Sequence, residues 1–92
     1  MQKTIERINK LCSGSGFFPL DGKKFRDRRL ASGMTQEAVA AEADVHTNSI
    51  YNWETGSHRP YVRQALRMCV VLKCIPDAIA TDEAVIEMEL GK

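Results

Sequence analysis

The sequence predicts an all-α protein built as one small domain. Its 92 residues match the size of a single domain. Apolar residues recur every three or four positions in several successive segments, which is the period of an α-helix. Residues that start helices, such as Asp21 and Thr35, precede these segments, and glycine or proline residues separate them. Helices joined by short connections are therefore expected.

The first 20 residues are expected to form an N-terminal extension. Residues 3–11 have the pattern of a short amphipathic helix, and residues 13–16 have the composition of a flexible linker. Phe17 and Phe18 follow, and they either pack against the main domain or contact a partner protein. The apolar side of the short helix consists of Ile5, Ile8, Leu11 and Cys12.

Two helix starts follow the extension. Asp21 is expected to cap a helix that runs to about Ala31 and ends before Gly33. Thr35 is expected to cap the next helix, because its hydroxyl can accept from a free backbone N–H. Glu37 lies in the first turn of that helix, where the helix dipole favours negative charge.

The second half of the chain continues the helical pattern. Residues 43–46 are a short connection to a third helix, which is expected from Thr47 to Glu54. Residues 55–60 are a loop by composition. A fourth helix is expected from Val62 to Lys73, and Pro76 can open a further short helical turn.

The tail, Thr81 to Leu90, fits two structures. The sequence Thr81-Asp82-Glu83 is a good helix start, whereas apolar residues alternate with Glu87 and Glu89 as they would in a strand. The helix is the favoured interpretation, and residues 81–92 are a candidate dimerisation element in either form.

The charges and the cysteines limit which partners and which cellular compartment are expected. The net charge of +1 says little about partners. Residues 23–29 hold five basic groups in seven, and this run either meets phosphates or forms a solvated helix face. Cys12, Cys69 and Cys74 are odd in number and match no common zinc spacing, so they are interpreted as free thiols in a reducing cytoplasm.

Several functional classes are disfavoured. The N-terminus is charged and lacks the apolar stretch of a signal peptide. No apolar run approaches the ~20 residues that span a bilayer. The sequence has no nucleophile and base at motif spacing, no phosphate loop and no metal-ligand cluster. We therefore expect no enzymatic activity, no cofactor, no metal and no membrane association.

The third expected helix separates an anchoring side from a polar side. At 100° per residue, Ile50 and Trp53 share one face. The opposite face is polar, uncharged and rich in hydrogen-bonding groups, namely those of Thr47, Asn48, Tyr51 and Asn52. The major groove of DNA admits one α-helix, and asparagine can bind adenine through two hydrogen bonds. On the residues alone, base reading and an ordinary polar surface helix weigh equally.

Family motifs run in register from Phe25 to Pro60. They comprise Thr35-Gln36-Glu37, the apolar positions Val39, Ala40, Val45 and Ile50, and Trp53-Glu54-Thr55-Gly56 with the proline that follows. In these features, residues 21–80 resemble the lambda-repressor/Cro type of helix-turn-helix domain, also called the XRE family. The resemblance implies a compact bundle of about five helices with the extension before it and the tail after it.

The resemblance also implies how DNA is bound. It places base contacts at Thr47, Asn48 and Asn52. It places a phosphate contact at Gln36, where the free N–H groups of a helix start favour anions. Further phosphate contacts are expected from Thr35, Tyr51, Thr55 and Arg59. Arg29 and Glu54 are expected to form a structural ion pair.

Four residues depart from the family pattern. Asp44 stands at the usual turn glycine, and aspartate tolerates a left-handed conformation better than most residues. Lys73 stands where a glycine often ends the fourth helix, and His46 and Tyr61 replace common helix caps.

The implied assembly is a homodimer on double-stranded DNA. One reading unit makes few base contacts, and a symmetric dimer reads two half-sites about 34–36 Å apart. The dimer contact is expected at the end of the fourth helix and in the tail, although the same residues could form the core of the subunit. They are Leu72, Ile75, Ile79, Ile86 and Leu90.

We therefore expect a Cro-like repressor, cytoplasmic and associated with the nucleoid when bound to DNA. One alternative is an antitoxin-type autorepressor that also binds a toxin protein through residues 1–20. Another is a protein-interaction module that has lost DNA binding. Non-specific DNA binding at low salt separates the last alternative from the others.

Overall fold

The computed structural model describes residues 2–12 and 16–90. These residues form six α-helices and one short 3₁₀ helix, without a β-strand among them. The elements are α1 (Gln2–Cys12), α2 (Gly22–Ala31), α3 (Gln36–Ala43), α4 (Thr47–Thr55), α5 (Val62–Leu72), η1 (Pro76–Ala78) and α6 (Asp82–Leu90). The predicted all-α class is confirmed, and the tail forms the predicted helix and not a strand. The linker expected at residues 13–16 lies outside the described residues except for Gly16.

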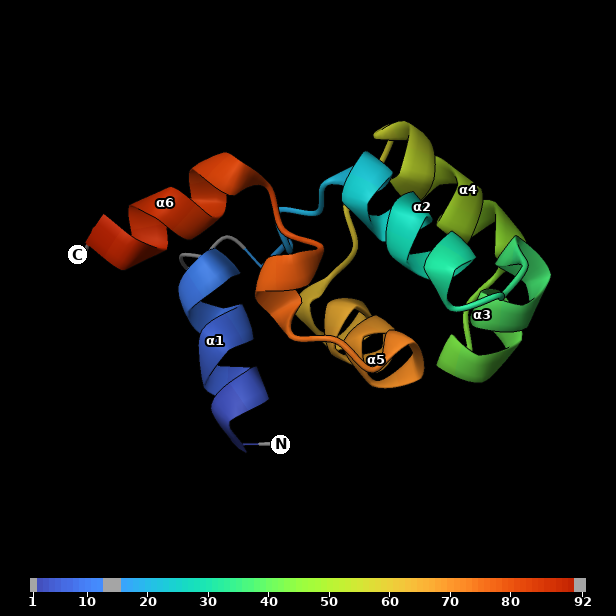
Figure 1. Cartoon of the computed structure of the whole chain (residues 1–92), viewed down its shortest axis with the longest axis horizontal. Coiled ribbons are helices and arrows are strands. Elements are labelled where there is room, and N and C mark those ends of the chain that lie inside the picture. The colour runs from blue at the N-terminus through green and yellow to red at the C-terminus, as the bar shows by residue number, and fades with distance from the viewer. Residues whose placement is uncertain (1, 13–15, 91–92) are drawn as a thin grey trace.

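The helices form a bundle that is longer in one direction, with extents of 37 × 26 × 22 Å. In Figure 1, α2, α3 and α4 lie at one end of the long axis, and α1 and α6 lie at the other. Helix α5 packs against both α3 and α1, so it joins the two ends of the bundle.

One hydrophobic core runs through the bundle. Five large side chains from five different segments have no exposed surface: Phe18, Phe25, Ile50, Met68 and Ile79. Burying a side chain of this size stabilises the fold by about 1.5–3 kcal/mol. The core is therefore the main reason why these short helices persist, because helices of 8–11 residues are marginal on their own.

Helix α1 belongs to this core. The predicted apolar side is correct, since Ile8, Leu11 and Cys12 are buried and Ile5 is half-buried. The two phenylalanines after the linker behave differently from each other. Phe18 is buried, whereas Phe17 is 43% exposed and its ring stacks on that of Tyr61.

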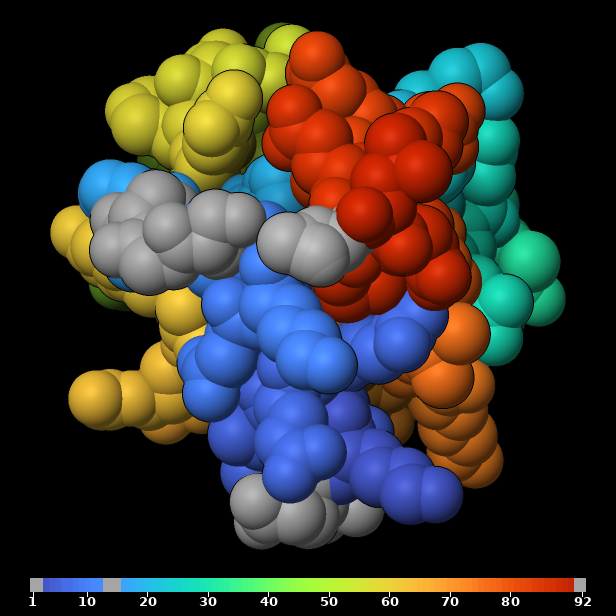
Figure 2. Space-filling view, turned by 90° about the vertical axis from the view of Figure 1, so that its left-hand side faces the viewer, coloured from blue at the N-terminus to red at the C-terminus, as the bar shows by residue number. Residues whose placement is uncertain are grey.

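Polar contacts fasten α6 and η1 to α1. Arg7 of α1 donates to both carboxylate oxygens of Asp77, at 3.0 and 2.8 Å, and to Glu89 of α6 at 3.0 Å. The hydrogen bond from Arg7 holds the pKa of Asp77 below its ordinary value. Figure 2 shows α6 lying against α1 on this end of the molecule.

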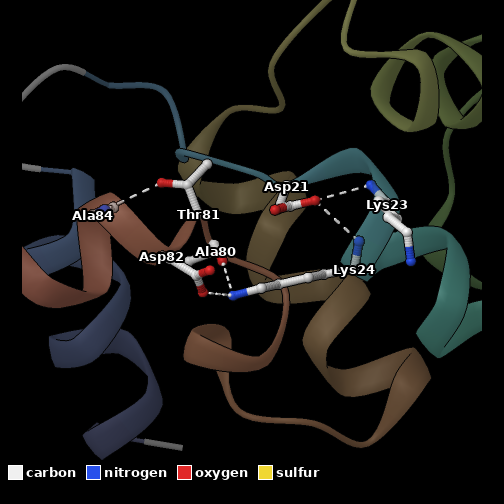
Figure 3. Close-up of polar contacts among 7 residues, drawn as sticks. All are labelled: Asp21, Lys23, Lys24, Ala80, Thr81, Asp82 and Ala84. Atoms are coloured by element: carbon white, nitrogen blue, oxygen red, sulfur yellow. Dashed lines mark hydrogen bonds and ion pairs between the residues drawn. The ribbon is translucent and has the colours of Figure 1, made fainter.

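A second set of polar contacts links the start of α2 to the start of α6 (Figure 3). Asp21 caps α2 as predicted, since its carboxylate accepts from the backbone N–H groups of Lys23 and Lys24. The Lys24 ammonium group donates to the Ala80 carbonyl at 2.9 Å and to the Asp82 carboxylate at 2.5 Å.

The structure corrects part of the expected dimer interface. Leu72 and Ile79 are 3% and 0% exposed, because both side chains fill the core of their own subunit. They cannot contact a second copy without unpacking that core. Ile75, Ile86 and Leu90 are exposed by 63%, 56% and 82%.

Candidate nucleic-acid interface

A tight connection sets α4 across the end of α3. Asp44 adopts the left-handed conformation expected at the turn position, with φ of 58°. The Val45 N–H then donates to the Ala40 carbonyl at 3.0 Å, which closes the end of α3. Helix α4 begins only two residues later, and α3 and α4 pack against each other. This is the geometry of a helix-turn-helix.

The inner side of α4 is anchored in the core. Ile50 is fully buried and Trp53 is 4% exposed. On α3, the small side chains of Ala40 and Ala43 are buried too, and their size allows α4 to approach closely. The anchor fixes which side of α4 faces outward.

The outer side of α4 is polar and carries no acidic group among its four residues. Asn48 and Tyr51 are exposed, and Thr47 and Asn52 are half-buried. Within the part of the chain that the structure describes, no hydrogen bond holds the Asn48 amide, so both its donor and its acceptor can meet a ligand. The four side chains thus share one accessible surface, which we call the polar face.

A buried ion pair fixes α2 to the end of α4. Arg29 Nε donates to Glu54 at 2.5 Å, and Arg29 Nη2 donates to the other carboxylate oxygen at 3.2 Å. Arg29 Nη1 also donates to the Met34 carbonyl at 2.9 Å. The hydrogen bond to Glu54 raises the pKa of Arg29, so the guanidinium stays charged. The side chains are 9% and 4% exposed, which makes this an internal brace.

Gln36 joins this ion pair, and sequence reasoning missed that contact. Its amide nitrogen donates to the Glu54 carboxylate at 3.1 Å. The side chain expected to bind phosphate is therefore engaged inside the subunit. Spacing along the sequence gives no sign of this contact, because α2, α3 and α4 must pack before the three side chains meet.

The other residues expected at phosphates are Thr35, Thr55 and Arg59, and the last two lie next to Asn52 of the polar face. The Thr35 hydroxyl accepts from the Ala38 N–H at 3.0 Å and so caps α3. The Thr55 hydroxyl donates to the Asn52 carbonyl at 3.2 Å. Arg59 is exposed and lines a hollow of about 480 Å³ beside Asn52.

The basic run at residues 23–29 is largely used within the subunit. Lys23 pairs with Asp27 on the same helix, and Lys24 pairs with Asp82. Arg28 donates to a backbone carbonyl at 3.3 Å, and Arg29 is the buried brace. Four of the five basic side chains thus have partners in the fold, but only Arg29 is buried, and Lys23, Arg26 and Arg28 stay exposed.

The described residues provide neither a metal-binding cluster nor a membrane-spanning helix. They contain no group of three histidine, cysteine or acidic side chains placed to hold a metal ion. None of their helices has both the length and the apolar character that crossing a bilayer requires.

Comparison with known proteins supports the fold assignment. A family profile described as a helix-turn-helix domain matches residues 22–81, well over half of the 92-residue chain. A search of curated proteins finds no match. The matched range contains both α3 and α4 and the connection between them, and it agrees with the resemblance to the lambda-repressor type. The chain belongs to the helix-turn-helix domain family.

Proposed function

We propose that this protein is a sequence-specific regulator of transcription that reads double-stranded DNA with the polar face of α4. The observation that carries the proposal is the pairing of an exposed, neutral, amide-bearing side with a buried apolar side on one short helix. An α-helix fits the major groove, and neutral hydrogen-bonding side chains there read base edges without repelling phosphates.

Asn48 is the residue best placed to read a base. Its amide is exposed in the first turn of α4, and the N-terminal residues of a recognition helix are the ones that reach base edges. Thr47 and Asn52 are half-buried on the same side and complete the reading set. Thr35, Tyr51, Thr55 and Arg59 are proposed to supply the phosphate contacts that position the helix.

Gln36 is proposed to reach phosphate after giving up its contact with Glu54. The Arg29 guanidinium still holds both oxygens of that carboxylate when the amide turns away. The cost of this rearrangement is therefore that of one hydrogen bond, about 1 kcal/mol.

The proposed active form is a homodimer that represses transcription by occupying a palindromic operator, as Cro-like proteins do. One copy of α4 offers few base contacts, so a second copy is needed for a longer site. The exposed side chains of Ile86 and Leu90 support a contact through α6. The antitoxin alternative is less well supported, since Ile8 and Leu11 of its proposed partner arm are buried in the subunit itself.

Selection of bound sequences from a random duplex pool tests the proposal. The expected result is a palindromic site whose half-sites are about one helical turn of DNA apart. The variant Asn48→Ala should then weaken binding by roughly 1–3 kcal/mol and relax the preference at one position of each half-site.

A matched control uses Asn9→Ala, which removes the same amide from an exposed position on α1. This variant should bind the selected site like the unmodified protein. If Asn48→Ala kept the full sequence preference, base reading by the polar face would be wrong. If no DNA bound even at low salt, the protein-interaction alternative would replace the proposal.

A further inference from the structure

Cys69 and Cys74 lie on either side of the C-terminal end of α5. Helix α5 ends with Lys73 in the left-handed conformation, at φ of 53°. The Lys73 N–H donates to the Val70 carbonyl at 3.3 Å, and the Cys74 N–H donates to the Cys69 carbonyl at 3.0 Å. These two bonds define a Schellman motif, in which the side chains at the two ends of the longer bond frequently contact each other. Those side chains are the thiols of Cys69 and Cys74.

The two thiols line the same surface hollow. Hydrogen bonding between them lowers the pKa of Cys74 and, together with burial, raises that of Cys69. The positive charge of Arg28 lowers the pKa of Cys74 further. Of the two thiols, Cys74 is therefore the one that ionises first.

Cys74, the thiol with the lowered pKa, is also the more exposed of the two cysteines. Cys69 is 2% exposed, whereas Cys74 is half-buried. Both line a surface hollow of about 310 Å³, which admits a small molecule to Cys74. The third cysteine, Cys12, is buried in the core, and its burial raises its pKa.

We propose that Cys69 and Cys74 are a redox-active dithiol, which a hydroperoxide converts into an intramolecular disulfide. The Cys74 thiolate attacks one oxygen of the hydroperoxide, so that an S–O bond forms, the O–O bond breaks and water or an alcohol leaves. The Cys69 sulfur, after losing its proton, attacks the resulting sulfenic acid and displaces hydroxide, which leaves as water. Overall, two thiols are oxidised and one hydroperoxide is reduced.

The geometry favours this disulfide over further oxidation of Cys74. A disulfide needs Cβ atoms about 3.5–4.5 Å apart, and the Schellman motif places the two cysteines at positions whose side chains frequently meet, both lining one hollow. We therefore expect the resolving thiol to reach the sulfenic acid without unfolding of α5.

Peptide mapping tests the proposal on the full chain. The reduced protein is treated with hydrogen peroxide, its remaining thiols are alkylated after unfolding, and it is digested with trypsin without reductant. Trypsin cuts after Arg67 and after Lys73, which places Cys69 and Cys74 in different peptides. The expected product is these two peptides joined by a disulfide, with Cys12 alkylated on a third peptide.

Mixing unlabelled and ¹⁵N-labelled protein before oxidation identifies bonds between chains. Joined peptides should carry one label only, and the same product should form in Cys12→Ala. In Cys74→Ser the joined peptides should be lost, while Trp53 fluorescence shows whether the variant stays folded. The proposal is overturned if the folded, oxidised protein yields Cys69 and Cys74 alkylated separately, joined to Cys12, or joined across the two labels.

Discussion

Removing Arg29 from its buried ion pair with Glu54 should lower the free energy of unfolding by about 3 kcal/mol. The substitution Arg29→Met keeps the apolar length of the side chain but removes the donors to Glu54 and to Met34. The Glu54 carboxylate, 4% exposed, then keeps Gln36 as its one remaining side-chain donor among the described residues. Breaking a buried ion pair in this way costs about 3–5 kcal/mol. We take the lower value because Gln36 continues to donate.

Urea unfolding followed by Trp53 fluorescence measures this cost. Trp53 is the one tryptophan in the sequence and is 4% exposed, so its emission reports the packing of α4. In a domain of this size, 3 kcal/mol corresponds to a fall in Tm of roughly 12–24 °C. The exposed neighbour offers a control, Arg28→Met, which should change the free energy of unfolding by less than about 0.5 kcal/mol.

The double variant Arg29→Met/Glu54→Leu distinguishes a lost pair from lost packing. Replacing both charges leaves no buried carboxylate without its partner, so the double variant should be more stable than Arg29→Met alone. The reasoning is refuted if Arg29→Met costs less than about 1 kcal/mol, or if the double variant is the less stable of the two.

Substitutions at Gly22, Lys73 and Asp77 test the backbone geometry and one ion pair through the stability of the fold. Gly22→Ala should lower the free energy of unfolding in urea by about 3 kcal/mol, because the added Cβ would meet a backbone carbonyl oxygen of α4 at 2.8 Å. Gly33→Ala serves as the comparison: its position is left-handed but lies in open space, so the loss should be only about 1 kcal/mol. Lys73→Gly should raise the unfolding free energy by about 0.5–1 kcal/mol, since glycine adopts the left-handed conformation without strain; an unchanged midpoint would contradict this. Because the pKa of Asp77 is lowered in the folded state, its contribution to the free energy of unfolding is present above about pH 4 and is lost as the pH falls through the folded-state pKa. Asp77→Asn should therefore flatten the acid side of the plot of stability against pH. An equally steep acid side would argue against this.

Much of the fold could be predicted because local chemistry and the final structure agree. Asp21 and Thr35 cap helices where their side chains predict caps, and apolar spacing identifies Ile50 and Trp53 as the inner side of α4. Even the departure at Asp44 fits, since the residue takes the left-handed conformation that its side chain tolerates. These features depend on neighbours within one helix turn, so the sequence carries them directly.

Contacts between distant segments were harder to predict. The spacing of Leu72 and Ile79 marks an apolar surface without saying whether the same chain or a second copy covers it, and here the same chain does. The basic run shows the same limit, because Lys24 meets Asp82 only once the fold has placed the start of α6 near the start of α2. Periodicity identifies a face, and only the packed structure identifies its partner.

In the candidate site too, features set by a single helix could be predicted, and contacts between packed helices could not. The polar face could be predicted from helical geometry alone, and Asn48 is exposed on it. The contact between Gln36 and Glu54 could not be predicted, because it needs three helices in place. The thiol pair of Cys69 and Cys74 had a usable signal, namely a spacing of five residues across a predicted helix end.

The most direct measurement of the central claim is an NMR titration of ¹⁵N-labelled protein with its selected duplex. If α4 enters the major groove, the side-chain amide of Asn48 should shift strongly and show intermolecular NOEs to base protons. The backbone amides of α4 should shift with it, and the Asn9 side chain on α1 should not move. Shifts confined to α1 and α6, with the Asn48 amide unchanged in a saturated complex, would contradict DNA reading by this helix.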